Sequence, residues 1–378
     1  MTARVLVVFG TRPEAIKMAP VILALQKDDQ IDCRVVATAQ HRQMLDQVLH
    51  AFAIRPDVDL DIMRDGQSLT SLTARLLHAF DDVLGKERPD AVLAQGDTTT
   101  VMAIALACFY QGIPFGHVEA GLRTGDLGNP FPEELNRVIA GKLAKWHFAP
   151  TPDARANLLA EGIADADIFV TGNTGIDALT SLPERHGDLP FALAADQRLL
   201  LVTAHRRENF GEPFERICRA VLSLVDANAD LRVVFPVHPN PNVKHVAHAL
   251  LGSHPRISLC EPLDYATFVA TMKRAYLILS DSGGVQEEAP ALGKPVLVLR
   301  RGTERPEVIR EGVAKLVGTD HDAIVAAAQS LLDDPAAYAR MARGVSPYGD
   351  GRAAARIVAV LRAHFQREKR SLGSVLPG

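Results

Sequence analysis

Short aliphatic runs recur along the whole chain, separated by stretches that are long enough for a helix. The runs are apolar without strict alternation and are bounded by Gly, Asp, Thr or Pro, which is typical of parallel strands buried on both faces. In the first half they lie at 4–9, 33–37, 91–94, 115–118, 147–149 and 168–170. Crossover helices are expected at 15–27, 69–84, 98–110 and 133–145. This half therefore predicts a Rossmann-like domain.

The pattern breaks at residues 181–197, where two prolines, a glycine and mixed charges predict a linker. It then restarts, with strands expected at 199–203, 232–235, 257–259, 276–279, 295–299 and 314–317. We predict an α/β protein with two Rossmann-like, doubly wound domains, residues 1–180 and 198–350, that face a cleft. Residues 351–368 predict a C-terminal helix that packs back on the first domain. Functional residues are expected in the loops after strands, where such sheets bind ligands.

The composition supports two globular domains and disfavours charged macromolecular partners. Of 378 residues, 47% are hydrophobic and 23% charged, and this length exceeds one ordinary hydrophobic core. The 41 basic and 45 acidic side chains leave a net charge of −4, which gives no footprint for nucleic acid or a membrane surface. No apolar run reaches about 18 residues and no signal peptide pattern is present, so we expect a cytoplasmic location.

The cysteines and histidines are too scattered to predict a metal or cofactor site. No CxxC or HExxH spacing occurs, which argues against zinc, redox catalysis and a disulfide framework. Free buried thiols are the expected state of the four cysteines, Cys33, Cys108, Cys218 and Cys260.

The first predicted strand runs into FGTRPE, which opens a helix. A glycine turn at Gly10, free helix N–H groups and the cations Arg12 and Lys17 would converge where a diphosphate could sit. The segment is neither GxGxxG nor a P-loop. The alternative is an ordinary strand-to-helix turn whose cations are solvated.

A second candidate loop, SDSGGVQEE, follows a predicted strand of the second domain. Gly283 and Gly284 would let backbone N–H groups approach an anion, and Ser282 adds a hydroxyl donor. Glu288, one helical turn beyond, could accept hydrogen bonds from a ribose diol. The alternative is an N-capping Ser282 before an acidic first turn, but it does not explain the doubled glycine.

Three carboxylates and one imidazole follow predicted strands or open predicted helices, and they suit acid–base chemistry. They are Asp97, Glu119, Glu133 and His205. Each has an ordinary alternative: Asp97 as a helix cap, Glu119 as a partner of Arg123, Glu133 as a first-turn charge, and His205 as a packed loop residue. Their joint presence on the face that holds both candidate phosphate loops favours the catalytic interpretation.

At these residues the chain resembles the non-hydrolysing UDP-N-acetylglucosamine 2-epimerases. The matching blocks are FGTRPEAIKMAP, TAQHRQMLDQ, QGDTTT, HVEAGLRTGD, FPEELNR, TGNTGIDAL, TAHRRENFG, VFPVHPNPNV, SDSGGVQEEAP, GKPVLVLRRGTERPE and PYGDG. The resemblance implies a glycosyltransferase-B-like fold, a homodimer, no cofactor, and interconversion of UDP-GlcNAc and UDP-ManNAc. The implied route eliminates UDP and adds it back through a 2-acetamidoglucal intermediate.

The resemblance also implies roles for individual residues. The catalytic groups would be Asp97, Glu119, Glu133 and His205. The nucleotide sugar would be bound by Arg12, Lys17, Phe268, Ser282, Gly283, Gly284, Glu288 and Arg305, with Phe268 against the uracil and Glu288 on the ribose. An allosteric UDP-GlcNAc site would use Gln40, Gln43, Arg206 and His238. Some family members have an arginine at the position of Gly66, just before the TxxxT helix. The resemblance therefore leaves the strength of allosteric regulation open.

Two other functions fit parts of the pattern. A retaining glycosyltransferase would use the same nucleotide loops but pass the sugar to an acceptor, and it needs no internal proton shuttle. A sugar-nucleotide sensor would bind without turnover. The carboxylate cluster favours the epimerase over both, while the sequence leaves open which carboxylate acts on which face of C2 and which sugar substituents are accepted.

Overall fold

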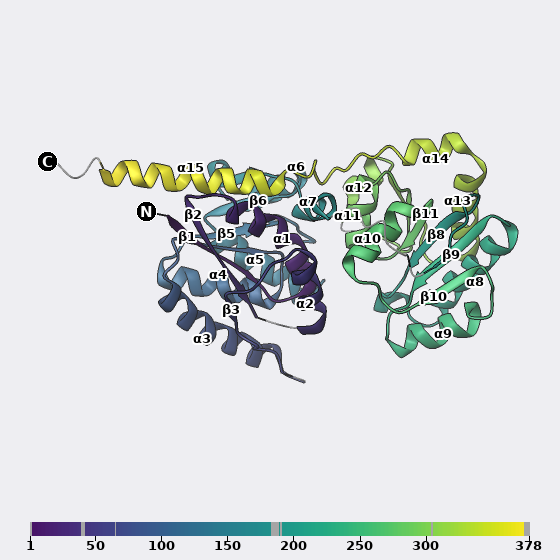
Figure 1. The fold of residues 1–378 in the computed structure, drawn as a ribbon, viewed down its shortest axis with the longest axis horizontal. Helices are drawn as coiled ribbons and strands as arrows, with labels where there is room; N and C mark the ends of the chain where they lie inside the picture. Colours follow the sequence, from purple (N-terminus) through teal and green to yellow (C-terminus); the bar gives the residue numbers. More distant parts are fainter. Residues whose placement is uncertain are drawn as a thin grey trace. The chain divides into compact units, whose positions relative to one another are not determined.

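The computed structural model describes residues 2–38, 42–64, 66–182, 189, 191–303 and 305–373, with the side chains of 42–44 and 370–373 left out. The chain divides into two compact units (Figure 1). The first unit consists of Met1–Leu182 and Tyr348–Gly378, and the second of Pro183–Pro347. Each is an α/β unit built on its own sheet, as the sequence predicts.

The described part of the first unit forms a seven-stranded parallel sheet of order β3-β2-β1-β4-β5-β6-β7. Its strands are β1 (Ala3–Phe9), β2 (Ile31–Ala37), β3 (Val58–Asp59), β4 (Ala91–Gln95), β5 (Phe115–Val118), β6 (Trp146–Ala149) and β7 (Ile168–Val170). Leu6 and Val7, which point to opposite faces of the sheet, are both fully buried. Helices therefore cover both faces, as the unalternating apolar runs predict.

Two groups of helices cover this sheet. The helices of the first unit are α1 (Arg12–Gln26), α2 (Arg42–Ala51), α3 (Leu69–Glu87), α4 (Thr99–Gln111), α5 (Glu133–Leu143), α6 (Pro152–Ala160), α7 (Thr174–Ser181) and α15 (Ala353–Gly373). Helix α4 packs against α3 and α5, whereas α1 packs against α2, α7 and α15. The strand order reverses between β1 and β4, so the turns after these strands lie where doubly wound sheets bind ligands.

The C-terminal helix belongs to the first unit (Figure 1). The carboxylate of Asp177 on α7 accepts hydrogen bonds from the backbone N–H groups of Ala353 (3.1 Å) and Ala354 (2.8 Å), which open α15. Since the first N–H groups of a helix have no partner within it, this buried carboxylate fixes the start of α15. The helix extends beyond the expected end at 368.

The second unit repeats the plan with a six-stranded parallel sheet of order β10-β9-β8-β11-β12-β13 among its described residues. Its strands are β8 (Arg198–Thr203), β9 (Leu231–Pro236), β10 (Ile257–Cys260), β11 (Leu277–Ser280), β12 (Val296–Val298) and β13 (Ala314–Leu316). Its helices are α8 (Glu212–Ala227), α9 (Pro241–Leu251), α10 (Tyr265–Arg274), α11 (Gly283–Ala291), α12 (Pro306–Arg310), α13 (His321–Asp333) and α14 (Pro335–Met341). The order reverses between β8 and β11. The candidate loop SDSGGVQEE follows β11, and His205 follows β8, at the place where such sheets bind ligands.

The expected strands are all present with small shifts of their ends. Among the described residues, the one strand that was not predicted is the two-residue β3. Seven of the seventeen residues of the proposed linker, 183–188 and 190, lie outside the described residues. All four cysteines are free, but only Cys108 and Cys218 are buried, while Cys33 and Cys260 are half-buried.

Candidate functional site

The turn after β1 is closed by its own side chains. Oε2 of the buried Glu14 accepts hydrogen bonds from the backbone N–H groups of Gly10 (2.9 Å) and Thr11 (2.6 Å). Oε1 of Glu14 accepts one from the Thr98 hydroxyl at 2.6 Å, which ties this turn to the turn after β4. Thr11 and Glu14 form a capping box at the start of α1. The expectation that these N–H groups are free for an anion is therefore wrong for Gly10 and Thr11.

Gly10 is needed here for packing. A Cβ at this position would lie 2.5 Å from Oγ1 of Thr38 and 2.8 Å from Oγ1 of Thr100. Arg12, the first residue of α1, is half-buried, and burial lowers the pKa of its guanidinium. The Arg12 guanidinium makes no ion pair with any residue that the structure describes. Arg12 is therefore a cation that could bind an anionic ligand, and it lies close to the point where the strand order reverses.

Lys17 and Glu119 form a largely buried ion pair. Lys17 Nζ, on α1, lies 2.5 Å from Glu119 Oε2, and the side chains are 14% and 8% exposed. Asn173 Nδ2 donates to the same oxygen at 3.1 Å. Glu119 directly follows β5 with a φ of 64°, a left-handed conformation that is costly for a residue with a side chain and is common at functional sites. The alternative pairing of Glu119 with Arg123 is wrong.

Arg123 pairs instead with Glu161. Its Nε and Nη2 atoms lie 2.5 and 3.0 Å from the two carboxylate oxygens, a bidentate contact. This pair leaves the Glu119 carboxylate to Lys17 and Asn173.

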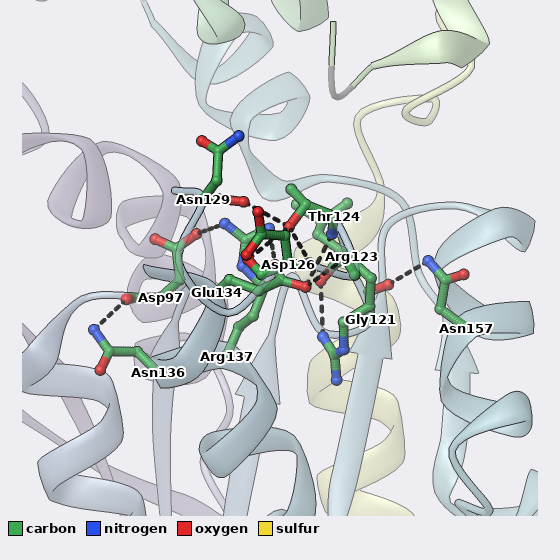
Figure 2. A network of polar contacts seen from close by, with 12 residues as sticks. Asp97, Gly121, Arg123, Thr124, Asp126, Asn129, Glu134, Asn136, Arg137 and Asn157 are labelled. Carbon is green, nitrogen blue, oxygen red and sulfur yellow. Dashed lines mark hydrogen bonds and ion pairs between the residues drawn. The ribbon is translucent and has the colours of Figure 1, made fainter. Parts of the chain in front are cut away.

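Asp97 follows β4 and is held from α5 (Figure 2). Its Oδ2 accepts from Arg137 Nη2 at 2.6 Å, and its backbone carbonyl accepts from Asn136 Nδ2 at 2.9 Å. Its side chain is 32% exposed. The cap of α4 is Thr98, whose hydroxyl accepts from the N–H of Val101. The alternative role of Asp97 as that cap is therefore wrong.

Glu133 and Glu134 open α5 and differ in their partners. Glu133 is half-buried, and its Oε2 atom is buried without a hydrogen-bond partner among the described residues. Glu134 is 1% exposed and accepts from the backbone N–H groups of Thr124 (2.9 Å) and Gly125 (3.0 Å). Its other oxygen lies 3.3 Å from Arg137 Nη1 (Figure 2). Arg137 therefore stands between the carboxylates of Glu134 and Asp97.

His117 fixes the turn that leads to Asp97. This fully buried residue of β5 shares a hydrogen bond of 2.7 Å between its Nε2 and the carbonyl oxygen of Gly96. Because a carbonyl only accepts, Nε2 carries the proton. Burial lowers the pKa of His117 to about 3, so the ring is neutral at pH 7. The sequence pattern alone does not distinguish His117 from other residues of a buried strand.

In the second unit, the buried Asp281 organises the loop after β8. Its Oδ2 accepts from the backbone N–H groups of His205 and Arg206, both at 2.9 Å, and from Asn209 Nδ2 at 3.0 Å. Nδ1 of His205 lies 3.4 Å from the other oxygen. His205 is 42% exposed and stacks on His238, with ring centroids 5.7 Å apart and an angle of 14°. The alternative of a packed loop histidine does not fit this exposure.

Ser282, Gly283 and Arg305 meet at the start of α11. Ser282 is the N-cap residue, but its side chain makes no cap hydrogen bond, so the capping alternative is wrong. A Cβ on Gly283 would lie 2.7 Å from Cζ of Arg305, whose Nε donates to the buried Glu287 at 2.7 Å. Gly283 is needed because the guanidinium lies against its backbone. A Cβ on Gly284 would meet nothing closer than 4.0 Å.

The remaining candidates lie on neighbouring helices or outside the described residues. Tyr265 on α10 donates to Glu288 Oε1 at 3.3 Å, and Phe268 on the same helix is half-buried. Gln40 and the side chain of Gln43 lie outside the described residues. Gly66 has a φ of 66° and open space around it.

Six residues that were not singled out from the sequence contact the candidate residues or the turns that carry them, namely His117, Glu134, Asn136, Arg137, Asn173 and Asp281. Asp281 directly follows a strand of the second unit, and that position was a signal for it. The residues of α5 lie inside the FPEELNR block, but only their contacts distinguish them from other helix residues.

The described residues contain no group of three or more His, Cys, Asp or Glu side chains that could hold a metal ion. No helix among them is long and apolar enough to span a membrane.

Comparison with known proteins identifies relatives over nearly the whole chain. The sequence model of the family described as UDP-N-acetylglucosamine 2-epimerase matches residues 23–362. The UDP-N-acetylglucosamine 2-epimerase of Salmonella typhimurium is 53% identical over 372 residues, which are 96% of this chain and 99% of that protein.

Solved structures agree with the sequence match. The UDP-GlcNAc 2-epimerase of Neisseria meningitidis bound to UDP-GlcNAc has a TM-score of 0.89 and 49% identity, covering 95% of this chain and 100% of that one. The glycotransferase of kitacinnamycin has a TM-score of 0.66 at 14% identity, over 95% and 99% of the two chains. This last likeness shows the fold alone, and it agrees with the glycosyltransferase-B-like architecture expected from the sequence.

Proposed function

Since the chain belongs to the UDP-N-acetylglucosamine 2-epimerase family, we propose that it epimerises C2 of UDP-GlcNAc by eliminating UDP and adding it back. The protein is an isomerase. The proposed intermediate is 2-acetamidoglucal, and the proposed product is UDP-ManNAc.

The chemistry of the substrate supports this route. The C2 proton is not α to a carbonyl, so its direct removal would face a very high barrier. In the proposed elimination the C1–O bond breaks and its electron pair leaves with UDP, while a carboxylate takes the C2 proton and a C1–C2 double bond forms. A proton then adds to the opposite face of C2, and UDP adds to C1. The reaction needs proton-transfer groups on both faces.

The observation that supports the proposal most is the cluster of acid–base groups in the first unit. Gln95 of β4 and Val118 of β5 are partners in the parallel ladder, so Asp97 and Glu119 follow neighbouring strands at one edge of the sheet. Each is held by fixed partners, Arg137 and Lys17 respectively. We propose that these two carboxylates, with Glu133 and His205, serve the proton transfers.

We propose that the nucleotide is bound by the groups at the strand-order reversals. The Ser282 hydroxyl does not cap its helix and can donate to a phosphate. Arg12, Lys17 and Arg305 supply positive charge. The Arg305 guanidinium lies against the Gly283 backbone, and the open space at Gly284 allows close approach. The roles of Glu288 on the ribose and of Phe268 on the uracil come from the family resemblance. These groups would stabilise UDP as it leaves and retain it for re-addition.

A product assay tests the proposed function against the glycosyltransferase. UDP-GlcNAc would be incubated with the protein alone, without acceptor, added metal or nicotinamide, and followed by NMR. The proposal expects UDP-ManNAc to accumulate to an equilibrium mixture. A UDP-GlcNAc signal that stays unchanged without an acceptor, but is consumed when one is added, would favour the glycosyltransferase, and binding without any turnover would favour the sensor.

We also propose a regulatory UDP-GlcNAc site at Gln40, Gln43, Arg206 and His238, as the family resemblance implies. The stacking of His238 on His205 supports it, because a ligand that contacts His238 would act on a neighbour of the candidate catalytic imidazole. With UDP-ManNAc as substrate, traces of UDP-GlcNAc should raise the initial rate, and His238→Ala should abolish that activation. Activation that is unaffected by this substitution would remove His238 from the site.

A homodimer and a cytoplasmic location are further proposals. Phe109 and Tyr110 at the end of α4 are 62% and 72% exposed, an apolar surface that a second copy could cover. Light scattering should then give twice the chain mass of 40.9 kDa, and cell fractionation should recover the protein with the cytoplasm.

A further inference from the structure

Arg137 contacts two carboxylates, those of Asp97 and Glu134. Its Nη2 atom lies 2.6 Å from Asp97 Oδ2, and its Nη1 atom lies 3.3 Å from Glu134 Oε2 (Figure 2). The Arg137 side chain is 10% exposed and that of Glu134 only 1%. Contacts between charges with so little water around them are screened weakly, so each strongly orients the other.

The two oxygens of Glu134 have separate partners. Oε1 accepts from the backbone N–H groups of Thr124 and Gly125, in the loop that follows β5. Oε2 makes no hydrogen bond with the described residues, and Arg137 is the cation that it faces. The backbone contacts therefore fix the position of the carboxylate, and the fixed carboxylate leaves Oε2 directed at the guanidinium.

Asp97 depends on α5 for its own position. Arg137 holds its side chain and the neighbouring Asn136 holds its backbone carbonyl. Its side chain is 32% exposed, so packing alone does not restrict its rotamers. If Asp97 were the only partner of the Arg137 guanidinium, the two side chains could move together. Because Glu134 also holds the guanidinium, Asp97 has a fixed partner.

We propose that Glu134 is a positioning residue for the reaction, acting through Arg137 to orient the carboxylate of Asp97. The inference rests on the proposed function, because it assumes that Asp97 takes part in proton transfer. It adds to that function a residue that touches neither the substrate nor the reacting atoms. The competing interpretation is that Glu134 only anchors the loop at Thr124 and Gly125.

The substitution Glu134→Gln separates the two roles. Glutamine keeps an amide oxygen that can accept from Thr124 and Gly125, but its NH₂ group would face the Arg137 guanidinium, donor against donor. We expect kcat to fall by about 10- to 100-fold, as expected when a catalytic group is misplaced by up to about 1 Å. KM for UDP-GlcNAc and the affinity for UDP should stay within about twofold. Rates are expressed per UDP-binding site, measured by calorimetry, so that unfolded protein does not count.

A matched control removes another arginine–carboxylate pair near the same loop. Glu161→Gln breaks the bidentate contact with Arg123, which precedes Thr124 directly but does not reach Asp97. Its kcat should equal that of the unsubstituted protein. Glu134→Asp, a second variant that keeps the charge opposite Arg137, should retain more of kcat than Glu134→Gln.

A double-mutant cycle with Asp97→Asn tests the coupling itself. If Glu134 acts through Asp97, adding Glu134→Gln to Asp97→Asn should lower kcat by less than about threefold. Three results would each overturn the inference. The first is an unchanged kcat in Glu134→Gln, the second is a double variant in which the two effects on kcat multiply, and the third is a lower kcat in Glu134→Asp than in Glu134→Gln. If the unsubstituted protein forms no UDP-ManNAc, the proposed function fails, whereas an active protein with an equally active Glu134→Gln variant overturns this inference alone.

Discussion

Lys17 Nζ on α1 lies 2.5 Å from Oε2 of Glu119, which follows β5, and this ion pair is largely buried. Removing one partner of such a pair leaves the other charge in a place where water cannot solvate it well. A residue expected to bind diphosphate and a residue expected to transfer protons are thus directly coupled. Substitutions at either one should affect both stability and turnover.

The first prediction compares Lys17→Met with Glu119→Gln. Lys17→Met leaves the carboxylate without this cation and should lower the free energy of unfolding by about 3 kcal/mol. Glu119→Gln keeps an oxygen that can accept from Lys17 and Asn173, so it should destabilise less, while kcat falls by about 10²- to 10⁴-fold through loss of proton transfer. Urea unfolding and NMR rates measure the two effects. Near-normal turnover in Glu119→Gln would remove Glu119 from the catalytic groups.

The alternation of strands and helices was predictable from the sequence because both faces of each strand are buried. That burial produces apolar runs without alternation, and the turns between them carry Gly, Pro and Asp. β3 was missed because it has only two residues, Val58 and Asp59, and too short a run carries no pattern. The turn after β1 was predicted as an anion site, but the side chain of Glu14, only four residues further along, occupies its N–H groups.

The partners within the site could not be predicted, because they join residues far apart in the chain. Arg137 and Asp97 are 40 positions apart, and Lys17 and Glu119 are 102 apart. Sequence reasoning therefore found the carboxylates that follow strands, but it offered Arg123 as the partner of Glu119, the cation nearest in sequence. Residues such as Glu134 and His117 become recognisable only when their contacts are known.

A second prediction concerns Ser282, whose hydroxyl makes no cap hydrogen bond. Ser282→Ala should leave the melting temperature almost unchanged and weaken UDP binding by the loss of a phosphate contact worth about 1.5–3 kcal/mol. Ser68→Ala is the matched control, because the Ser68 hydroxyl does cap its helix, α3, by accepting from the N–H of Ser71. That control should lose about 1 kcal/mol of stability and no UDP affinity. The opposite result for the two serines would return Ser282 to the role of a cap.

The third prediction compares Gly283 with Gly284. A methyl group on Gly283 would overlap the Arg305 guanidinium and push it from Glu287, whereas one on Gly284 has open space. Gly283→Ala should therefore weaken UDP binding and lower the melting temperature, and Gly284→Ala should keep the melting temperature. Calorimetry and thermal unfolding measure both. Equal melting temperatures for the two variants would contradict the packing of Arg305 on Gly283.

The fourth prediction concerns His117. Burial lowers the pKa of this residue to about 3. In the unfolded chain an ordinary histidine has a pKa of about 6.5. Between these values the unfolded state binds a proton that the folded state does not, so the free energy of unfolding falls as the pH falls. The slope from this residue is about 1.4 kcal/mol per pH unit.

His117→Gln removes the titration and keeps a donor for the carbonyl of Gly96. The stability advantage of the unsubstituted protein over this variant should therefore shrink between pH 6.5 and pH 4. Urea unfolding at several pH values measures it. Parallel pH dependences of the two proteins would mean that His117 is not held neutral by the fold.

The proton at C2 of the sugar gives the most direct test of the proposed reaction. UDP-GlcNAc would be incubated with the protein in D₂O, without added metal or nicotinamide, and the recovered UDP-sugars analysed by NMR. Elimination and re-addition of UDP predict deuterium at C2 of the UDP-ManNAc formed and, as the reaction reverses, at C2 of UDP-GlcNAc, with none at the other carbons. UDP-ManNAc that retains its original C2 proton in full would contradict the proposed mechanism.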